Sequence, residues 1–159
     1  SSRVDTRSDC SVSGSTSRGV MIRGAVFILL VLLIGCMPDS DIDKVRTVNS
    51  QVNNMLTYRT DRDEHWQTLA ETLRLRTGDC EDYAIAKYEK LLARGIPESD
   101  LKIAVGYYKG KGHAWLLYKD LVLDYDTNET KRLDQRPDLK LLYILDSLDE
   151  VQGEMARRN

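Results

Sequence analysis

The stretch Gly78-Asp79-Cys80-Glu81-Asp82-Tyr83-Ala84-Ile85-Ala86-Lys87-Tyr88 decides how the rest of the chain is interpreted. Its apolar residues recur at helical spacing, which predicts a helix with one side facing a core. Asp79 is a typical N-cap, and Asp82 stands where a capping-box acid belongs. A glycine and a proline follow shortly after Arg94 and favour an end there. We therefore expect a helix from Cys80 to about Arg94, with the cysteine in its first turn.

A thiol in this position is a candidate nucleophile. The backbone N–H groups and the dipole at a helix N-terminus stabilise the thiolate, which is the reactive form. The flanking acids Asp79, Glu81 and Asp82 oppose this effect by repelling a second negative charge. A basic partner is therefore needed, and histidine is the usual choice. The alternative is a buried, chemically inert cysteine.

The chain contains two histidines, His65 and His113. His65 lies in the polar stretch 61–67 and is expected to be solvated. His113 opens an apolar strand directly after a glycine-rich turn, so it would lie at the end of a sheet, within reach of a neighbouring helix. The alternative for His113 is an ordinary surface residue at a strand end.

A third group should orient the imidazole of the histidine. With a two-residue turn at Lys119-Asp120, His113 falls opposite Asp126 on the next strand. Asp124 then lies one diagonal step away on the same face of the sheet. A different turn length would place Asp124 directly opposite, so the register alone leaves both aspartates as candidates.

The periodicity of the chain predicts three helices followed by an antiparallel sheet, which is an α+β domain. The expected helices and strands are Val45–Tyr58, Trp66–Leu75 and Cys80–Arg94, then Leu101–Tyr108, His113–Tyr118, Leu121–Tyr125 and Leu139–Leu145. The turn before the second strand is placed at residues 110–112, and residues 152–159 are expected to form a frayed tail. A single domain is predicted over 45–159.

The N-terminal region, residues 1–44, is not predicted to be part of this domain. Residues 1–20 are rich in Ser, Arg and Gly and predict a disordered leader outside the native protein, with Met21 as the true start. Residues 21–35 have the single positive charge and apolar run of a signal peptide. The run ends in Leu33-Ile34-Gly35-Cys36, typical of a bacterial lipoprotein, so residues 36–44 are expected to be a lipidated cysteine and a tether. Met37 after Cys36 favours the outer membrane. The predicted location is thus the periplasm, on a lipid anchor.

Cysteine usage agrees with a reactive thiol. Cys10 lies in the leader and Cys36 carries the lipid, which leaves Cys80 without a disulfide partner in an oxidising compartment. Without lipidation, a Cys36–Cys80 disulfide is the alternative. The net charge of −2 over 159 residues gives no reason to expect a nucleic-acid partner.

The stretch 78–88 resembles the nucleophile segment of the bacterial transglutaminase-like cysteine peptidases, the LapG-like periplasmic proteases. Similar segments are Val48-Asn49, Asn53, Tyr58, Asp61, Trp66, Thr68, Glu71, His113 and Val122-Leu123-Asp124. The resemblance covers roughly residues 45–126 and implies a papain/transglutaminase-like core. It implies Cys80 as nucleophile, His113 as general base and Asp124 as orienting acid, because Asp124 follows Val-Leu as in the family. The backbone N–H of Cys80 is a candidate for holding the oxyanion.

The resemblance also implies Ca²⁺, bound by acids at the positions of Asp79 and Glu81. Carboxylate oxygens suit this ion. The alternative for these two residues is a helix cap and a first-turn acid without a metal. Family members cleave a large surface adhesin in biofilm control and are restrained by an inner-membrane cyclic-di-GMP receptor, so both become candidate partners.

The chain departs from the family pattern at Leu69, Glu64-His65 and Tyr125, which leaves the triad intact but opens the question of substrate. Two other functions remain as alternatives. One is another acyl-transfer enzyme, an amidase or a transglutaminase, because a fold does not fix its chemistry. The other is a catalytically idle, calcium-dependent binding module.

Overall fold

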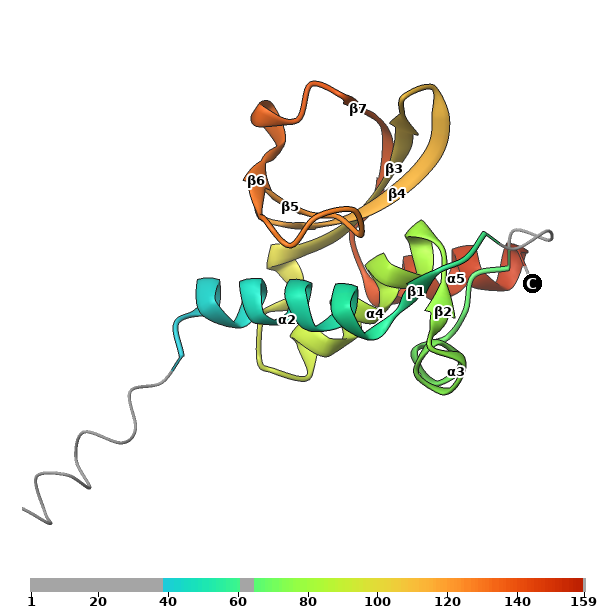
Figure 1. Cartoon of the computed structure of the whole chain (residues 1–159), viewed down its shortest axis with the longest axis horizontal. Coiled ribbons are helices and arrows are strands. Elements are labelled where there is room, and N and C mark those ends of the chain that lie inside the picture. The colour runs from blue at the N-terminus through green and yellow to red at the C-terminus, as the bar shows by residue number, and fades with distance from the viewer. Residues whose placement is uncertain (1–38, 61–64, 159) are drawn as a thin grey trace, which may run out of the picture. The chain divides into compact units, whose positions relative to one another are not determined.

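The structure is a computed structural model that describes residues 39–60 and 65–158. Its elements are α2 (Asp41–Met55), β1 (Thr57–Tyr58), α3 (Leu69–Leu75), β2 (Thr77–Gly78), α4 (Cys80–Leu92), η1 (Glu98–Asp100), β3 (Leu101–Tyr108), β4 (Lys111–Tyr118), β5 (Leu121–Leu123), β6 (Lys131–Arg132), η2 (Leu133–Gln135), β7 (Leu139–Leu145) and α5 (Leu148–Arg158) (Figure 1). The predicted α+β class is confirmed. The predicted leader, signal peptide and lipidated Cys36 lie outside the described residues. No helix in the described ranges has the length and apolar character that a membrane crossing requires.

The five-stranded sheet has the order β6-β5-β4-β3-β7, and each neighbouring pair is antiparallel. β3 and β7 have the bounds that the sequence predicts. The β3–β4 turn lies at Lys109-Gly110, earlier than expected, with φ angles of 51° and 80°. Two central residues with positive φ match the twist of a tight hairpin, so β4 begins at Lys111 rather than at His113.

The helices near the N-terminus differ from their predicted bounds. α2 begins at Asp41, because the Ser40 hydroxyl accepts from the Asp43 N–H at 3.2 Å, so the predicted tether is shorter. α3 begins at Leu69, where Thr68 and Glu71 form a capping box. Thr72 is the buried residue of this short helix, whereas Leu73 is exposed.

The expected frayed tail is wrong, since α5 is a helix that packs on β7. Its buried residues are Val151, Met155 and the carboxyl-bearing Glu154. The Glu154 carboxylate accepts from Arg157 and Arg158, which satisfies its charge at the edge of the core. Leu148, Val151 and Met155 stand at helical spacing and form the side of α5 that faces the core, a pattern that the prediction of a tail from residue 152 divided.

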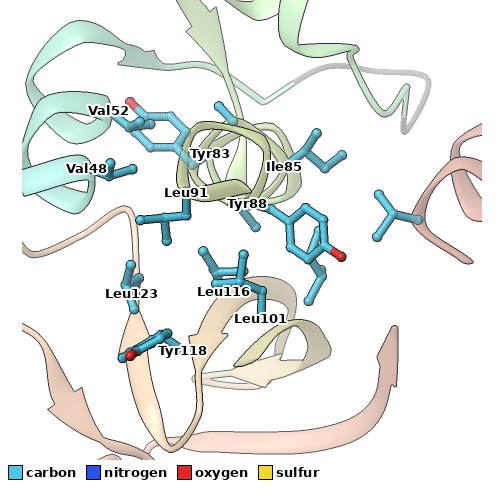
Figure 2. Packing of buried hydrophobic residues seen from close by; sticks show 14 of the residues in the cluster. Val48, Val52, Tyr83, Ile85, Tyr88, Leu91, Leu101, Leu116, Tyr118 and Leu123 are labelled. Carbon is cyan, nitrogen blue, oxygen red and sulfur yellow. The ribbon is translucent and has the colours of Figure 1, made fainter. Parts of the chain in front are cut away.

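The main core lies between α4, α2 and one face of the sheet (Figure 2). α4 is buried on nearly all sides because it lies between these two partners, and its apolar residues Ala84, Ile85, Tyr88 and Leu91 are buried. Leu92 is only partly buried. The opposite face of the sheet covers a smaller cluster of Ala104, Trp115, Leu117, Val122 and Leu139. The N-terminus of α4 is thereby held against β4.

A short parallel ribbon fixes the approach to that N-terminus. β1 pairs with β2, with Thr57 beside Thr77 and Tyr58 beside Gly78. Gly78 needs to lack a side chain, because a Cβ there would lie 2.6 Å from Cβ of Asp82. The ribbon therefore brings Tyr58 next to the first turn of α4.

Candidate active site

Cys80 is the first residue of α4, as predicted, and Asp79 is its N-cap. The capping acid is Asp82: its Oδ2 accepts from the Asp79 N–H at 3.2 Å, and its Oδ1 accepts from the Gln67 N–H at 2.8 Å. Asp82 is almost fully buried. It therefore fixes the start of the helix and ties the segment before α3 to it.

The Cys80 thiol donates to Oε2 of Glu81 at 3.1 Å. Burial and the neighbouring Glu81 carboxylate raise the pKa of the Cys80 thiol, while the backbone N–H of Ala114 lowers it. Burial also raises the pKa of Glu81 to about 8, and its hydrogen bond with the Asp79 carboxyl acts in the same direction. In this state the acids flanking Cys80 keep it protonated. This agrees with the sequence-based expectation that these acids oppose the stabilisation of the thiolate by the helix N-terminus.

His113 and Asp124 are in contact on the sheet. His113 Nε2 lies 3.0 Å from Asp124 Oδ1, and both side chains are buried. A carboxylate can only accept, so Nε2 carries the proton and Nδ1 is the free acceptor of the ring. Burial raises the pKa of Asp124, but the hydrogen bond and charge of His113, the Tyr125 N–H and the Arg136 charge together outweigh it, and the net pKa is lowered.

The strand register explains why Asp124 makes this contact. Tyr118 pairs with Leu121 and Leu116 with Leu123, across the two-residue turn that the sequence predicts. The ladder ends at Leu123, so Asp126 never takes the place opposite His113. The Asp126 carboxylate instead lies 4.0 Å from Arg136. The structure places Asp124, not Asp126, on the histidine.

Aromatic rings surround the imidazole on three sides. The ring centroids of Tyr108, Trp115 and Tyr125 lie 5.4, 5.8 and 5.5 Å from that of His113. Rings this close restrict rotation of the imidazole, so the hydrogen bond to Asp124 keeps a single orientation.

Three further residues hold Asp124: Asn53, which the resemblance names without a role, Lys87 and Arg136. The side chains of Lys87 and Asn53 donate to its backbone carbonyl at 2.8 and 2.9 Å. Arg136 donates to its Oδ2 at 3.2 Å. Burial lowers the pKa of Lys87 to about 7, against the opposite effect of the charges on Asp124 and Asp126. The sequence could have indicated Lys87, because a lysine among the apolar positions of a helix is unusual. Arg136 lies in a loop, where no periodicity indicates a buried contact.

Cys80 and His113 line one cleft of about 350 Å³. The cleft is also bounded by Tyr58, Trp66, Asp79, Glu81, Leu142 and Tyr143. His65 does not line it: the side chain is 41% exposed and lies 3.7 Å from Glu71, as expected for a solvated histidine. The cleft therefore joins the predicted nucleophile, the predicted base and the predicted metal-binding acids.

The residues 39–60 and 65–158 contain no group of three or more His, Cys, Asp or Glu side chains arranged around a metal position. Asp79 and Glu81 nevertheless form a buried carboxyl pair joined by a hydrogen bond. Two such carboxyls need either a shared proton or a cation between them. Their donor chemistry fits a hard divalent ion.

The family of bacterial transglutaminase-like cysteine proteinases matches residues 36–139. The chain belongs to this family. Among solved structures, this transglutaminase-like cysteine peptidase is similar to Legionella pneumophila LapG, with a TM-score of 0.66 and 27% identity over 76% of this chain and 80% of that chain. The calcium-bound form of that protein gives a TM-score of 0.63 and 28% identity, over 73% and 79% of the two chains. Its EGTA-treated form gives 0.66 and 27%, over 76% and 81%.

No curated protein matches the chain. The family match and the LapG structures confirm the predicted family, the transglutaminase-like core and the assignment as a cysteine peptidase.

Proposed function

We propose that this cysteine peptidase cleaves a protein substrate with Cys80 as nucleophile, His113 as general base and Asp124 as orienting acid. The observation that carries the proposal is the buried His113–Asp124 hydrogen bond of 3.0 Å beside Cys80 in one cleft. The bond fixes the tautomer that leaves Nδ1 of His113 able to accept a proton. A base positioned in this way contributes about 10²–10⁴-fold in rate.

In the proposed reaction His113 takes the thiol proton of Cys80, and the sulfur attacks the carbonyl carbon of the scissile bond. The negative charge moves to the carbonyl oxygen, which the backbone N–H of Cys80 at the helix N-terminus would stabilise. When this intermediate collapses, the C–N bond breaks and His113 gives its proton to the leaving amine. Water, deprotonated by His113, then hydrolyses the thioester and returns the thiol.

A cation held by Asp79 and Glu81 belongs to the same proposal. Without one, the Glu81 carboxylate accepts from Cys80 and keeps the sulfur protonated. A bound Ca²⁺ would supply positive charge that offsets both carboxylates and favours the Cys80 thiolate. The calcium-bound structure of Legionella LapG supports metal binding in a relative.

The site of action and the partners are further parts of the proposal. The signal-peptide pattern and Cys36 favour a lipid-anchored protein of the periplasm, at the outer membrane. The likeness to LapG favours a large surface adhesin as substrate, in biofilm control, and an inner-membrane cyclic-di-GMP receptor as regulator. Cleavage of a candidate adhesin by the purified chain, read as one new N-terminus, would test this part.

Alkylation of the thiols tests the catalytic pair directly. The purified protein is treated with iodoacetamide with and without Ca²⁺, and the Cys80 peptide is quantified by mass spectrometry, which separates it from Cys10 and Cys36. We expect rapid labelling that Ca²⁺ accelerates and that His113→Ala slows, while the control His65→Ala leaves it unchanged. Slow labelling that neither His113 nor Ca²⁺ affects would favour the idle binding module.

The nature of the product separates peptidase from acyl transferase. A peptidase leaves a new N-terminus on the substrate, whereas a transglutaminase leaves an isopeptide bond and an amidase releases ammonia. Mass spectrometry of a protein mixture incubated with the wild type and with Cys80→Ala distinguishes these products.

A further inference from the structure

A second hollow, of about 260 Å³, adjoins the Cys80 cleft at His113. Its lining residues are Tyr58, Tyr108, Lys109, Lys111, Gly112, His113 and Tyr125. Of these, Tyr58, Gly112 and His113 also line the cleft that contains Cys80. The imidazole is therefore part of the wall common to the two hollows, and the nucleophile lines only one of them. We call the second hollow the tyrosine–lysine pocket.

The walls of the tyrosine–lysine pocket are aromatic. The rings of Tyr58 and Tyr125 stack with centroids 4.5 Å apart. The Lys109 ammonium lies 4.7 Å from the centroid of the Tyr108 ring. Rings of this kind provide rigid contact area for a peptide that passes over them.

The charge at this pocket is positive. Both lysines are exposed, and within the described ranges neither ammonium has a carboxylate inside ion-pair distance. The nearby Asp126 and Asp138 pair with Arg136, at 4.0 and 3.0 Å. The hydrogen bond of Lys109 with the Tyr108 side chain raises the pKa of Lys109, and the charges of these two aspartates also raise it. The pocket is lined by two cations and no acid, whereas the Cys80 cleft contains the carboxyl pair of Asp79 and Glu81.

We propose that the tyrosine–lysine pocket binds the part of the substrate that follows the scissile bond and selects an acidic side chain there. The inference rests on the proposed function. In that reaction His113 hands its proton to the leaving amine, so the leaving half of the substrate lies on the imidazole side of the sulfur. The pocket is the hollow that continues past the imidazole, and its two exposed ammonium groups favour a carboxylate, Lys111 more than Lys109, which hydrogen-bonds the Tyr108 side chain.

The substrate class that follows is an extended segment with Asp or Glu in the first few positions after the cut. The acyl half lies in the cleft that contains the Asp79–Glu81 carboxyl pair as well as Arg158, so an acid there has no two-lysine surface to select it. A peptide with acids only before the cut would be a poorer substrate than one with the same acids after it.

The experiment uses the full chain and a synthetic peptide library with all residue types at each position. New N-termini are sequenced by mass spectrometry for the wild type, Lys111→Glu and Lys131→Glu. The last is a matched control, because Lys131 is also an exposed first residue of a strand but does not line either hollow. Lys109→Asn is added, since asparagine tolerates the positive φ of this turn position.

We expect Asp and Glu to be enriched after the cut for the wild type and Lys131→Glu. In Lys111→Glu the preference should fall by about fivefold, the size of an exposed ion pair replaced by a repulsion. Lys109→Asn should reduce the preference for Asp and Glu by about half as much as Lys111→Glu does. Cuts without an acidic preference, or with one that Lys111→Glu leaves unchanged, would overturn the inference while the peptidase stands.

A binding measurement separates the pocket from the chemistry. Fluorescence anisotropy compares labelled Gly-Asp-Glu-Gly with Gly-Lys-Lys-Gly on the Cys80→Ala variant, which does not need turnover. We expect tighter binding of the acidic peptide, and loss of that difference in Cys80→Ala/Lys111→Glu. If the wild type cuts nothing, the proposed function fails, and only this binding comparison then tests whether the pocket prefers acidic side chains. Equal binding of the two peptides would overturn that preference.

Discussion

The Arg136 guanidinium donates to Oδ2 of Asp124 at 3.2 Å, while Nε2 of His113 donates to Oδ1 of the same carboxylate at 3.0 Å. The Asp124 side chain is fully buried. Arg136 is itself fixed by three hydrogen bonds to the Asp138 carboxylate. The orienting acid proposed for the site is therefore held from both oxygens. Burial raises its pKa, but the contacts with His113, the Tyr125 N–H and Arg136 together hold that pKa low.

Replacing Arg136 with methionine should lower the free energy of unfolding by about 3 kcal/mol, because it leaves a buried carboxylate with one partner fewer. Urea denaturation measures the change. Arg132→Met is the control: Arg132 pairs with Asp120 and Asp134 at the exposed surface, where such pairs contribute about 0–1 kcal/mol. Equal losses in the two variants would contradict a special role for Arg136.

The two aspartates of the sequence analysis can be separated by a pair of isosteric changes. Asp124→Asn removes the charge that orients His113, so cleavage and Cys80 alkylation should fall by about 10²–10⁴-fold. Asp126→Asn alters a partly exposed carboxylate 4.0 Å from Arg136 and should have little effect. A larger loss in Asp126→Asn would reverse the assignment.

Lys87 should make stability depend on pH. Burial depresses its pKa to about 7 in the folded state, whereas the unfolded side chain has a pKa of 10.5. Between these values the unfolded state binds more protons, so stability rises with pH and the penalty for the buried charge is full below the folded pKa.

From pH 7 to pH 9 the Lys87 contribution amounts to about 2 kcal/mol. Urea midpoints at the two pH values measure it, and Lys87→Met should abolish that part of the rise. An unchanged rise in the variant would mean that other groups cause it.

Gly106 should not tolerate a side chain. It pairs with His113 across β3 and β4, and a Cβ there would lie 2.0 Å from the Lys140 carbonyl oxygen, at the bulge between β3 and β7. Gly106→Ala is expected to lower stability by about 3 kcal/mol through displacement of β7. Gly112→Ala, which meets no atom within 4 Å, should change stability by less than about 0.5 kcal/mol. Thermal unfolding of the two variants compares them, and similar values would show that β7 can shift freely.

Sequence periodicity predicted β3 and the start of α4, and it also predicted β7, of which only the two end residues are buried. β3 and β7 have their predicted bounds, and the Lys119-Asp120 turn set the β4–β5 register correctly. α5 was missed although Leu148, Val151 and Met155 stand at helical spacing, because the expected tail began at residue 152 and divided that pattern.

The site could be predicted where chain geometry is local. Cys80 at a helix start follows from capping, and the diagonal relation of His113 to Asp124 follows from the register. The choice between Asp124 and Asp126 depended on where β5 ends, which alternation does not determine. Arg136 reaches the site from a loop after β6, and the spacing of residues along the sequence does not predict a contact of this kind.

Cys80 begins a helix, whereas His113 belongs to a hairpin strand that packs on that helix. The two side chains come from separate layers of the fold, and only the packing of the sheet on α4 brings them into one cleft. The cleft therefore has no counterpart in either layer alone, and a variant that loosens the core between α4 and the sheet should lose the geometry of the site along with its stability.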